Sequence, residues 1–117
     1  MQGRRIDRIE EQLRIELSQI IEREIQDPRI GLVSITNVKV AADLSHARVL
    51  ISSLGNDEER RKQLKGLRSA ASFVRRSLSK RLHHLRRMPE LTFDYDETLE
   101  RGNRIEELLN QIKTDEQ

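Results

Sequence analysis

Apolar side chains recur at spacings of three and four residues in several segments of this chain, which is typical of amphipathic helices. The first such segment predicts a helix from about residue 4 to residue 25. Pro28 cannot donate a backbone hydrogen bond and disfavours helical geometry at Asp27, so we expect the helix to stop before them. Its apolar positions are Ile6, Ile9, Leu13, Leu17, Ile20, Ile21 and Ile25.

Two segments rich in β-branched residues follow and predict an antiparallel hairpin. They cover residues 32–40 and about 47–52, with a short polar connection between them. In the first segment the apolar positions change from odd to even numbers near Asn37. Because one extra residue turns the following side chains to the other face, this change predicts a β-bulge.

A long helical segment lies between a predicted cap at Asn56 or Asp57 and a stop at Pro89. The small residues 69–72 are expected to kink or divide it into two helices, the second continuing to about residue 87. Its apolar stripe, which we expect to face the core, consists of Leu64, Leu67, Ala71, Val74, Leu78, Leu82 and Leu85.

A third strand and a terminal helix complete the pattern. Residues 91–96 alternate apolar and polar side chains, and residues 98–112 carry a weaker helical pattern before a short tail. The order α-β-β-α-α-β predicts an α+β domain of two layers, with three strands and the helices on one face. We expect this single domain over residues 1–97, and a C-terminal helical extension and tail over residues 98–117.

Charge is strongly separated along the chain, although the formal net charge is only +2. The stretch from Arg60 to Met88 holds 11 of the 22 Lys and Arg residues and no Asp or Glu. All 20 acidic residues therefore lie outside it. Such a polarised surface is typical of a protein that binds a polyanion.

A basic stripe accompanies the apolar stripe along the same helical segment. Its side chains shrink around Ser72, so that another backbone can approach closely. We expect phosphates to lie there, held by cations and by backbone N–H groups. The residues predicted to contact the phosphates are Lys65, Arg68, Ser69, Ala70, Ala71, Ser72, Arg75, Arg76, Lys80 and Arg81, with Arg4, Arg5 and Arg29 as secondary candidates.

Support for catalysis is scarce. The chain has no cysteine, no Gly-rich phosphate loop and no His-Glu-x-x-His or Gly-x-Ser-x-Gly motif. His83 and His84 are adjacent, so on a helix they point about 100° apart and do not form a chelating pair. We predict no metal site, no cofactor and no enzymatic activity. One rival hypothesis stays open, a Mg²⁺-dependent nuclease that uses Asp94 and Asp96 on one strand face.

A second rival hypothesis gives the basic segment a different ligand. The same helix suits duplex DNA or an anionic membrane surface, so a general nucleic-acid-binding module is the alternative interpretation. No apolar run approaches the ~18 residues of a membrane span, and no membrane partner is expected beyond that alternative. Tyr and Phe together number three and Trp is absent, which favours recognition of nucleic-acid shape and backbone over base stacking.

Several short motifs together resemble the bacterial ribosome-binding factor A family. In chain order they are Asp27-Pro28-Arg29, Val38-Lys39-Val40, Asp43-Leu44-x-x-Ala47-x-Val49, Leu54-Gly55, Phe73-Val74-Arg75, Arg81-Leu82 and Pro89-Glu90-Leu91-x-Phe93-x-x-Asp96. The resemblance covers about residues 5–109. Its specificity lies in the order and spacing of the motifs, because an Asp-Pro-Arg turn alone is common.

The resemblance implies a KH-like domain of type II with a mixed sheet and no Gly-x-x-Gly loop. It also implies a non-enzymatic, cytoplasmic protein that binds the small (30S) ribosomal subunit and its 16S rRNA. Such a protein assists late maturation and 5′-end processing of that RNA, with a link to growth in the cold; we expect a monomer. The family's Ala-x-Gly kink corresponds here to Ala70-Ala71-Ser72, and serine carries a steric cost if the glycine needs a positive φ.

Overall fold

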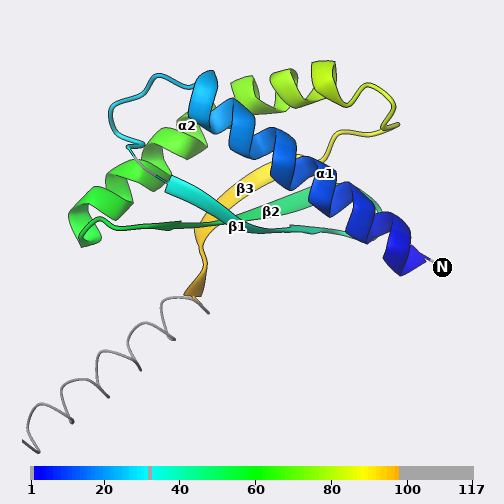
Figure 1. The fold of residues 1–117 in the computed structure, drawn as a ribbon, viewed down its shortest axis with the longest axis horizontal. Helices are drawn as coiled ribbons and strands as arrows, with labels where there is room; N and C mark the ends of the chain where they lie inside the picture. The colour runs from blue at the N-terminus through cyan, green and yellow to red at the C-terminus, as the bar shows by residue number, and fades with distance from the viewer. Residues whose placement is uncertain (1, 32, 98–117) are drawn as a thin grey trace, which may run out of the picture.

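Two helices cover one face of a three-stranded sheet (Figure 1). The structure is a computed structural model that describes residues 2–31 and 33–97, so the helix predicted over residues 98–112 and the tail lie outside the described residues. The predicted α+β architecture of two layers is confirmed. In chain order the elements are α1 (Gln2–Arg23), β1 (Val33–Val40), β2 (His46–Ser53), α2 (Asp57–Arg81) and β3 (Glu90–Tyr95).

The sheet is mixed, as the family resemblance implies. Its order is β1-β2-β3, with β1 antiparallel to β2 and β3 parallel to β2. The predicted bulge is present, because the register shifts between Ile35 and Asn37. The extra residue is Thr36, whose hydroxyl lies 2.7 Å from Asp96 Oδ2 and 3.2 Å from Leu50 O. The bulge therefore also ties the end of β3 to the hairpin.

The core lies between the sheet and the two helices. The apolar stripes of both helices face it as predicted, and the strands contribute alternate residues. Leu67, Val74 and Leu78 of α2 are fully buried, whereas Leu64, Ala71 and Leu85 are partly buried against the cluster. The other core residues buried to 1% exposure or less are Leu13, Leu17, Ile20, Val38, Ala47, Val49, Ile51 and Phe93.

Helix α2 is continuous through residues 69–72, so the prediction that these residues divide it is wrong. Ser72 does not have a positive φ; in the described residues that conformation occurs at Gly31 and Leu44. Figure 1 shows that the two ends of α2 run in different directions, and the helix is continuous from Asp57 to Arg81. Ser72 stands where the resemblance implies a glycine, and an unbroken helix has no need of glycine's conformational freedom there.

Helix α2 also ends at Arg81, six residues before the predicted end. With 25 residues it is about 37 Å long, whereas the 8 residues of β2 span only about 26 Å. The chain must then return from the overhanging helix end to start β3 beside the start of β2. Residues 82–89 make this return, with the buried Leu82 and Pro89 at its two ends.

The Asp27-Pro28-Arg29 turn packs closely against α2 at Gly66. The Asp27 side chain accepts a hydrogen bond from Arg29 N at 2.9 Å and forms an ion pair with Arg29 Nη2 at 2.6 Å, so the turn is rigid. A Cβ on Gly66 would lie only 2.9 Å from Cγ1 of the buried Ile30. Gly66 therefore lets the turn contact the helix backbone directly.

Replacing Gly66 by alanine is expected to destabilise the fold by about 1–3 kcal/mol, because the buried Ile30 has to move. This sign is opposite to the stabilisation of up to about 1 kcal/mol that Gly→Ala gives inside an open helix. Urea unfolding measures both effects. The matched control is Gly3→Ala in α1, where a Cβ meets nothing within 4 Å. Stabilisation by both substitutions would contradict the close contact.

Candidate nucleic-acid interface

The solvent side of α2 carries a column of residues that we call the basic face: Lys65, Ser69, Ser72, Arg76 and Lys80. These positions lie opposite the buried stripe, as the helical period predicts. In the described part of the chain no hydrogen bond or ion pair engages the side chains of Lys65 and Arg76. Their cationic groups are therefore available to an external anion.

Two further predicted contacts border the basic face and are partly used by the fold. Arg68 Nη2 lies 3.3 Å from Phe93 O and 3.4 Å from Asp94 Oδ1. Arg75 Nη2 donates to Met88 O at 2.8 Å. Each guanidinium has five N–H donors, so both residues keep donors for an external acceptor. Arg68 links α2 to β3, and Arg75 links α2 to the return segment over residues 82–89. Both still place positive charge beside the basic face.

Arg81 is drawn away from the basic face toward α1. Its guanidinium lies 3.0 Å from Glu16 Oε2, 3.0 Å from Gln19 Oε1 and 2.8 Å from Glu24 Oε1, and its side chain is only 29% exposed. These bonds raise the pKa of Arg81 and lower the pKa of Glu24 below its ordinary value of 4.5. Arg81 thus joins the two helices and is poorly placed to meet a phosphate.

Glu24 should make the stability of the domain depend on acidic pH. Its folded-state pKa is lowered, chiefly by the hydrogen bond from Arg81, so its contribution is present at neutral pH and is lost as pH falls below about 4.5. We expect the stability of Glu24→Gln to fall less steeply than that of wild type between pH 5 and pH 3 in urea unfolding. Glu22→Gln removes a carboxylate from the last turn of α1, two residues before Glu24, without touching Arg81 and serves as the control. Parallel curves for wild type and Glu24→Gln would contradict the assignment.

The small residues of α2 give a low surface but no free backbone donors. Ser69 is exposed and Ser72 lies on the same side, whereas Ala70 and Ala71 are half-buried against the core. The expectation that backbone N–H groups bind phosphate here is wrong, because in an unbroken helix they donate to the carbonyl groups of the preceding turn. What remains is a pair of small exposed side chains, Ser69 and Ser72, between Lys65 and Arg76.

Phe73 borders the same face and was not among the predicted contacts. It is 42% exposed, an unusual position for one of only three Phe and Tyr residues in the chain. At helical spacing it neighbours Ser69 and Arg76. Its position around the helix axis, outside the apolar stripe, was the feature of the sequence that indicated its exposure. An aromatic ring beside cations is a surface on which a nucleic-acid base can stack.

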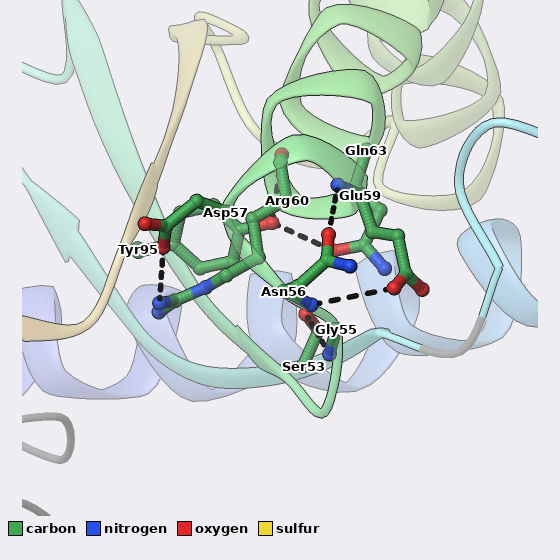
Figure 2. Close-up of polar contacts among 8 residues, drawn as sticks. All are labelled: Ser53, Gly55, Asn56, Asp57, Glu59, Arg60, Gln63 and Tyr95. Atoms are coloured by element: carbon green, nitrogen blue, oxygen red, sulfur yellow. Dashed lines mark hydrogen bonds and ion pairs between the residues drawn. The ribbon is translucent and has the colours of Figure 1, made fainter.

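The cation at the start of α2 serves the fold. Figure 2 shows Arg60 against Tyr95, and the guanidinium carbon lies 4.4 Å from the ring centroid. The Tyr95 hydroxyl also lies 2.8 Å from Arg60 O and 2.6 Å from Gln63 Oε1. Burial raises the pKa of this phenol. Not every cation of the basic segment therefore belongs to one binding surface.

The same figure shows why α2 begins where it does. Asn56 is the cap: its side chain accepts from Glu59 N at 2.9 Å, and the Glu59 side chain accepts in return from Asn56 N. The acidic first turn, Asp57 to Glu59, also suits the positive end of the helix dipole. Of the two caps predicted from the sequence, the structure uses Asn56.

The residues of the nuclease alternative are held in structural contacts. Asp94 lies 3.4 Å from Arg48 and 3.4 Å from Arg68, and Asp96 accepts from Thr36. Among the residues that the structure describes, no three His, Asp or Glu side chains gather to hold a metal ion. Among the secondary candidates, Arg29 is paired with Asp27, whereas Arg4 and Arg5 line a cleft at the start of α1.

Neither described helix has an apolar stretch long enough to cross a membrane.

Comparison with known families gives a match over most of the chain. The family model described as "Ribosome-binding factor A" matches residues 5–109. This range includes all three strands, nearly all of α1, the whole of α2 and the basic face.

Solved structures of similar fold carry the same description. The crystal structure of ribosome-binding factor A from Thermus thermophilus has a TM-score of 0.68 and 27% sequence identity, covering 77% of this chain and 94% of that one. The solution structure of a putative ribosome binding factor A from Thermotoga maritima has a TM-score of 0.69 and 29% identity, covering 77% and 85%. A homology model of the Thermus thermophilus factor, fitted into a cryo-EM map of its complex with the 30S subunit, has a TM-score of 0.59 and 27% identity, covering 72% and 87%.

Proposed function

The chain belongs to the ribosome-binding factor A family, and from this membership we propose that it binds the small ribosomal subunit through the basic face of α2. The observation that carries the proposal is the exposure of Lys65 and Arg76, which have no ion-pair partner among the described residues, on an unbroken helix held firmly to the core. The similar factor fitted into a 30S complex supports the same partner. The ligand on the subunit is its 16S rRNA.

Binding on this face is mainly electrostatic. Cations at Lys65, Arg76 and Lys80, with partial help from Arg68 and Arg75, neutralise phosphates of the RNA backbone. The small side chains of Ser69 and Ser72 let the RNA strand approach the helix closely. Because these contacts involve no chemical step, the protein acts by occupying and holding an rRNA segment.

The biological role that follows is assistance to late maturation of the small subunit, including processing near the 5′ end of its rRNA. The factor supplies no catalytic group; other enzymes cut the RNA. We place its action in the cytoplasm, as a monomer without a cofactor, and expect it to matter most during growth in the cold, when misfolded RNA rearranges slowly.

Sedimentation tests the proposal directly. The protein is mixed with purified small subunits, large subunits or whole ribosomes and centrifuged through sucrose. We expect it to travel with the small subunit, and a large excess of duplex DNA or of anionic lipid vesicles should not release it. Equal binding to large subunits, or release by either competitor at matched phosphate concentration, would favour the general polyanion-binding alternative.

Phe73 gives the proposed interface a contact that does not depend on salt. If its exposed ring stacks on an RNA base, Phe73→Ala should weaken binding of single-stranded RNA by about 1–3 kcal/mol, or roughly 5- to 150-fold. The dependence of affinity on salt should stay unchanged, because no phosphate contact is lost. Phe73→Tyr keeps the ring and should bind like wild type in fluorescence anisotropy. An unchanged affinity for Phe73→Ala would show that the ring does not contact RNA.

A further inference from the structure

A second concentration of positive charge lies beyond the end of α2, outside the basic face. A cleft of about 430 Å³ separates the first turns of α1 from the return segment before β3, at the side of the molecule where Figure 1 marks the N-terminus. Arg4, Arg5 and Arg8 line one wall, and His84 and Arg86 line the other. The volume is within the range of small-ligand sites, about 300–1,000 Å³.

The side chains that line this cleft include several cations and no carboxylate. The lining includes no Asp or Glu, and the first turn of α1 has no acidic residue. Arg4 and Arg5 therefore add positive charge to the positive end of the helix dipole, where proteins usually place acids, as α2 does. Asp43 borders a smaller adjoining hollow, where its carboxylate accepts hydrogen bonds from Ser45 N at 3.0 Å and Ser45 Oγ at 2.6 Å.

The floor of the cleft adds a second, independent feature. It is apolar, formed by Ile9, Leu44 and Leu85. Leu44 has a φ of +61°, and among the described residues it is the one side-chain-bearing residue with a positive φ. A bulky residue in this conformation is strained, and such strain is concentrated at binding sites, where the surroundings hold it in place. The turn thus presents the Leu44 side chain to a cleft rimmed by cations.

We infer that this cleft binds a phosphate of single-stranded RNA, together with the sugar that follows it. The inference rests on the proposed function, and it adds a second contact to the basic face. The arginine side chains on both walls suit a phosphate, because a guanidinium group donates two parallel hydrogen bonds to the phosphate oxygens. The apolar floor suits the sugar and base edge, which free inorganic phosphate lacks.

A titration followed by amide NMR locates the ligand. The probe is a mixed-sequence single-stranded RNA octanucleotide, with inorganic phosphate in a separate sample. We expect saturating shifts at residues 5–9, 44 and 84–86 with RNA, and weaker shifts at the same residues with phosphate. Shifts with phosphate but none with RNA would overturn the assignment of RNA as the ligand, and no shift at these residues with either probe would overturn the site.

Paired substitutions measure the contact. Arg5→Gln with Arg86→Gln removes one cation from each wall, and Arg23→Gln with Lys39→Gln removes two exposed cations elsewhere. We expect the first pair to weaken octanucleotide binding at least 5-fold and to flatten the plot of log affinity against log salt by about 0.7, for the one phosphate contact that is lost on a single strand. The second pair should change the affinity and the salt slope by less than half of these amounts. Equal effects of the two pairs would overturn the cleft, because general charge would then explain both.

Small-subunit sedimentation, run in parallel, separates this inference from the proposed function. If wild type binds the octanucleotide at the cleft but does not sediment with the small subunit, the proposed function fails and the cleft stands. If wild type sediments with the subunit but the Arg5→Gln, Arg86→Gln protein binds the octanucleotide with unchanged affinity and salt dependence, the cleft fails and the proposed function stands. Unchanged thermal unfolding of both variant pairs would show that a loss of folding does not cause the changes in RNA binding.

Discussion

Changing Arg76 and Lys80 together to glutamate is expected to abolish binding to the small ribosomal subunit while leaving the domain folded. Both side chains are exposed and one helical turn apart, so about four units of charge change at the C-terminal end of the basic face. Neither residue contacts the core, and stability should fall by less than about 1 kcal/mol. Co-sedimentation reports binding, and circular dichroism reports the fold.

The matched control is the pair Arg23→Glu and Lys39→Glu, which makes the same change of charge at exposed positions on α1 and β1. Lys39 follows the buried Val38 and lies on the sheet face opposite the helices. This protein should sediment with the small subunit nearly as wild type does. We would abandon the basic face if the folded Arg76→Glu, Lys80→Glu protein still sedimented at wild-type levels.

The milder pair Arg76→Ala and Lys80→Ala measures how many phosphates are involved. Three to five phosphate contacts predict a wild-type slope of log affinity against log salt of about −2 to −4.5. Losing two contacts should flatten it by about 1.4–1.8. An unchanged slope with weaker binding would point to a contact other than phosphate at these two residues.

The largest expected loss of stability comes from the buried side of the same helix. Leu78 is fully buried, and Leu78→Ala should destabilise the domain by about 2–5 kcal/mol through lost contacts and the cavity left behind. Leu54→Ala makes the same chemical change at a fully exposed position and should cost less than about 0.5 kcal/mol. Urea unfolding measures both. A loss below about 1 kcal/mol at Leu78 would contradict the packing of α2.

Within the described residues, local patterns in the sequence predicted α1, the three strands, the start of α2 and the faces that these elements bury. The change of parity near Asn37 predicted the bulge, because side chains in a strand alternate strictly. The apolar stripe predicted which side of α2 faces the core, and therefore that Arg76 on the opposite side is exposed. Two predictions about α2 were wrong. The small residues 69–72 do not divide it, and its end depends on where β3 has to start, which no local signal reports.

The candidate site was predictable as a surface but not residue by residue. Basic spacing placed Lys65 and Arg76 on one face, but nothing local indicates that Arg81 meets Glu16 and Glu24, which precede it by more than fifty residues. Such pairings depend on how helices cross, and that is fixed only when the whole core packs. The cleft at the start of α1 was missed for the same reason, because its two walls are far apart in the sequence.

The mixed sheet has a consequence for the order in which the chain folds. The hairpin closes between Val40 and Ala47, whereas the parallel pair closes between His46 and Glu90, a loop about six times as long. By the logarithmic dependence of closure entropy on length, the second closure costs roughly 1.6 kcal/mol more. β1 and β2 can therefore pair early from local contacts, whereas β3 gains its partner only after α2 has crossed the sheet. During synthesis, Glu90 emerges well after the hairpin, so β2 is left for a time as an unpaired strand edge, which is a site for wrong pairing with another chain.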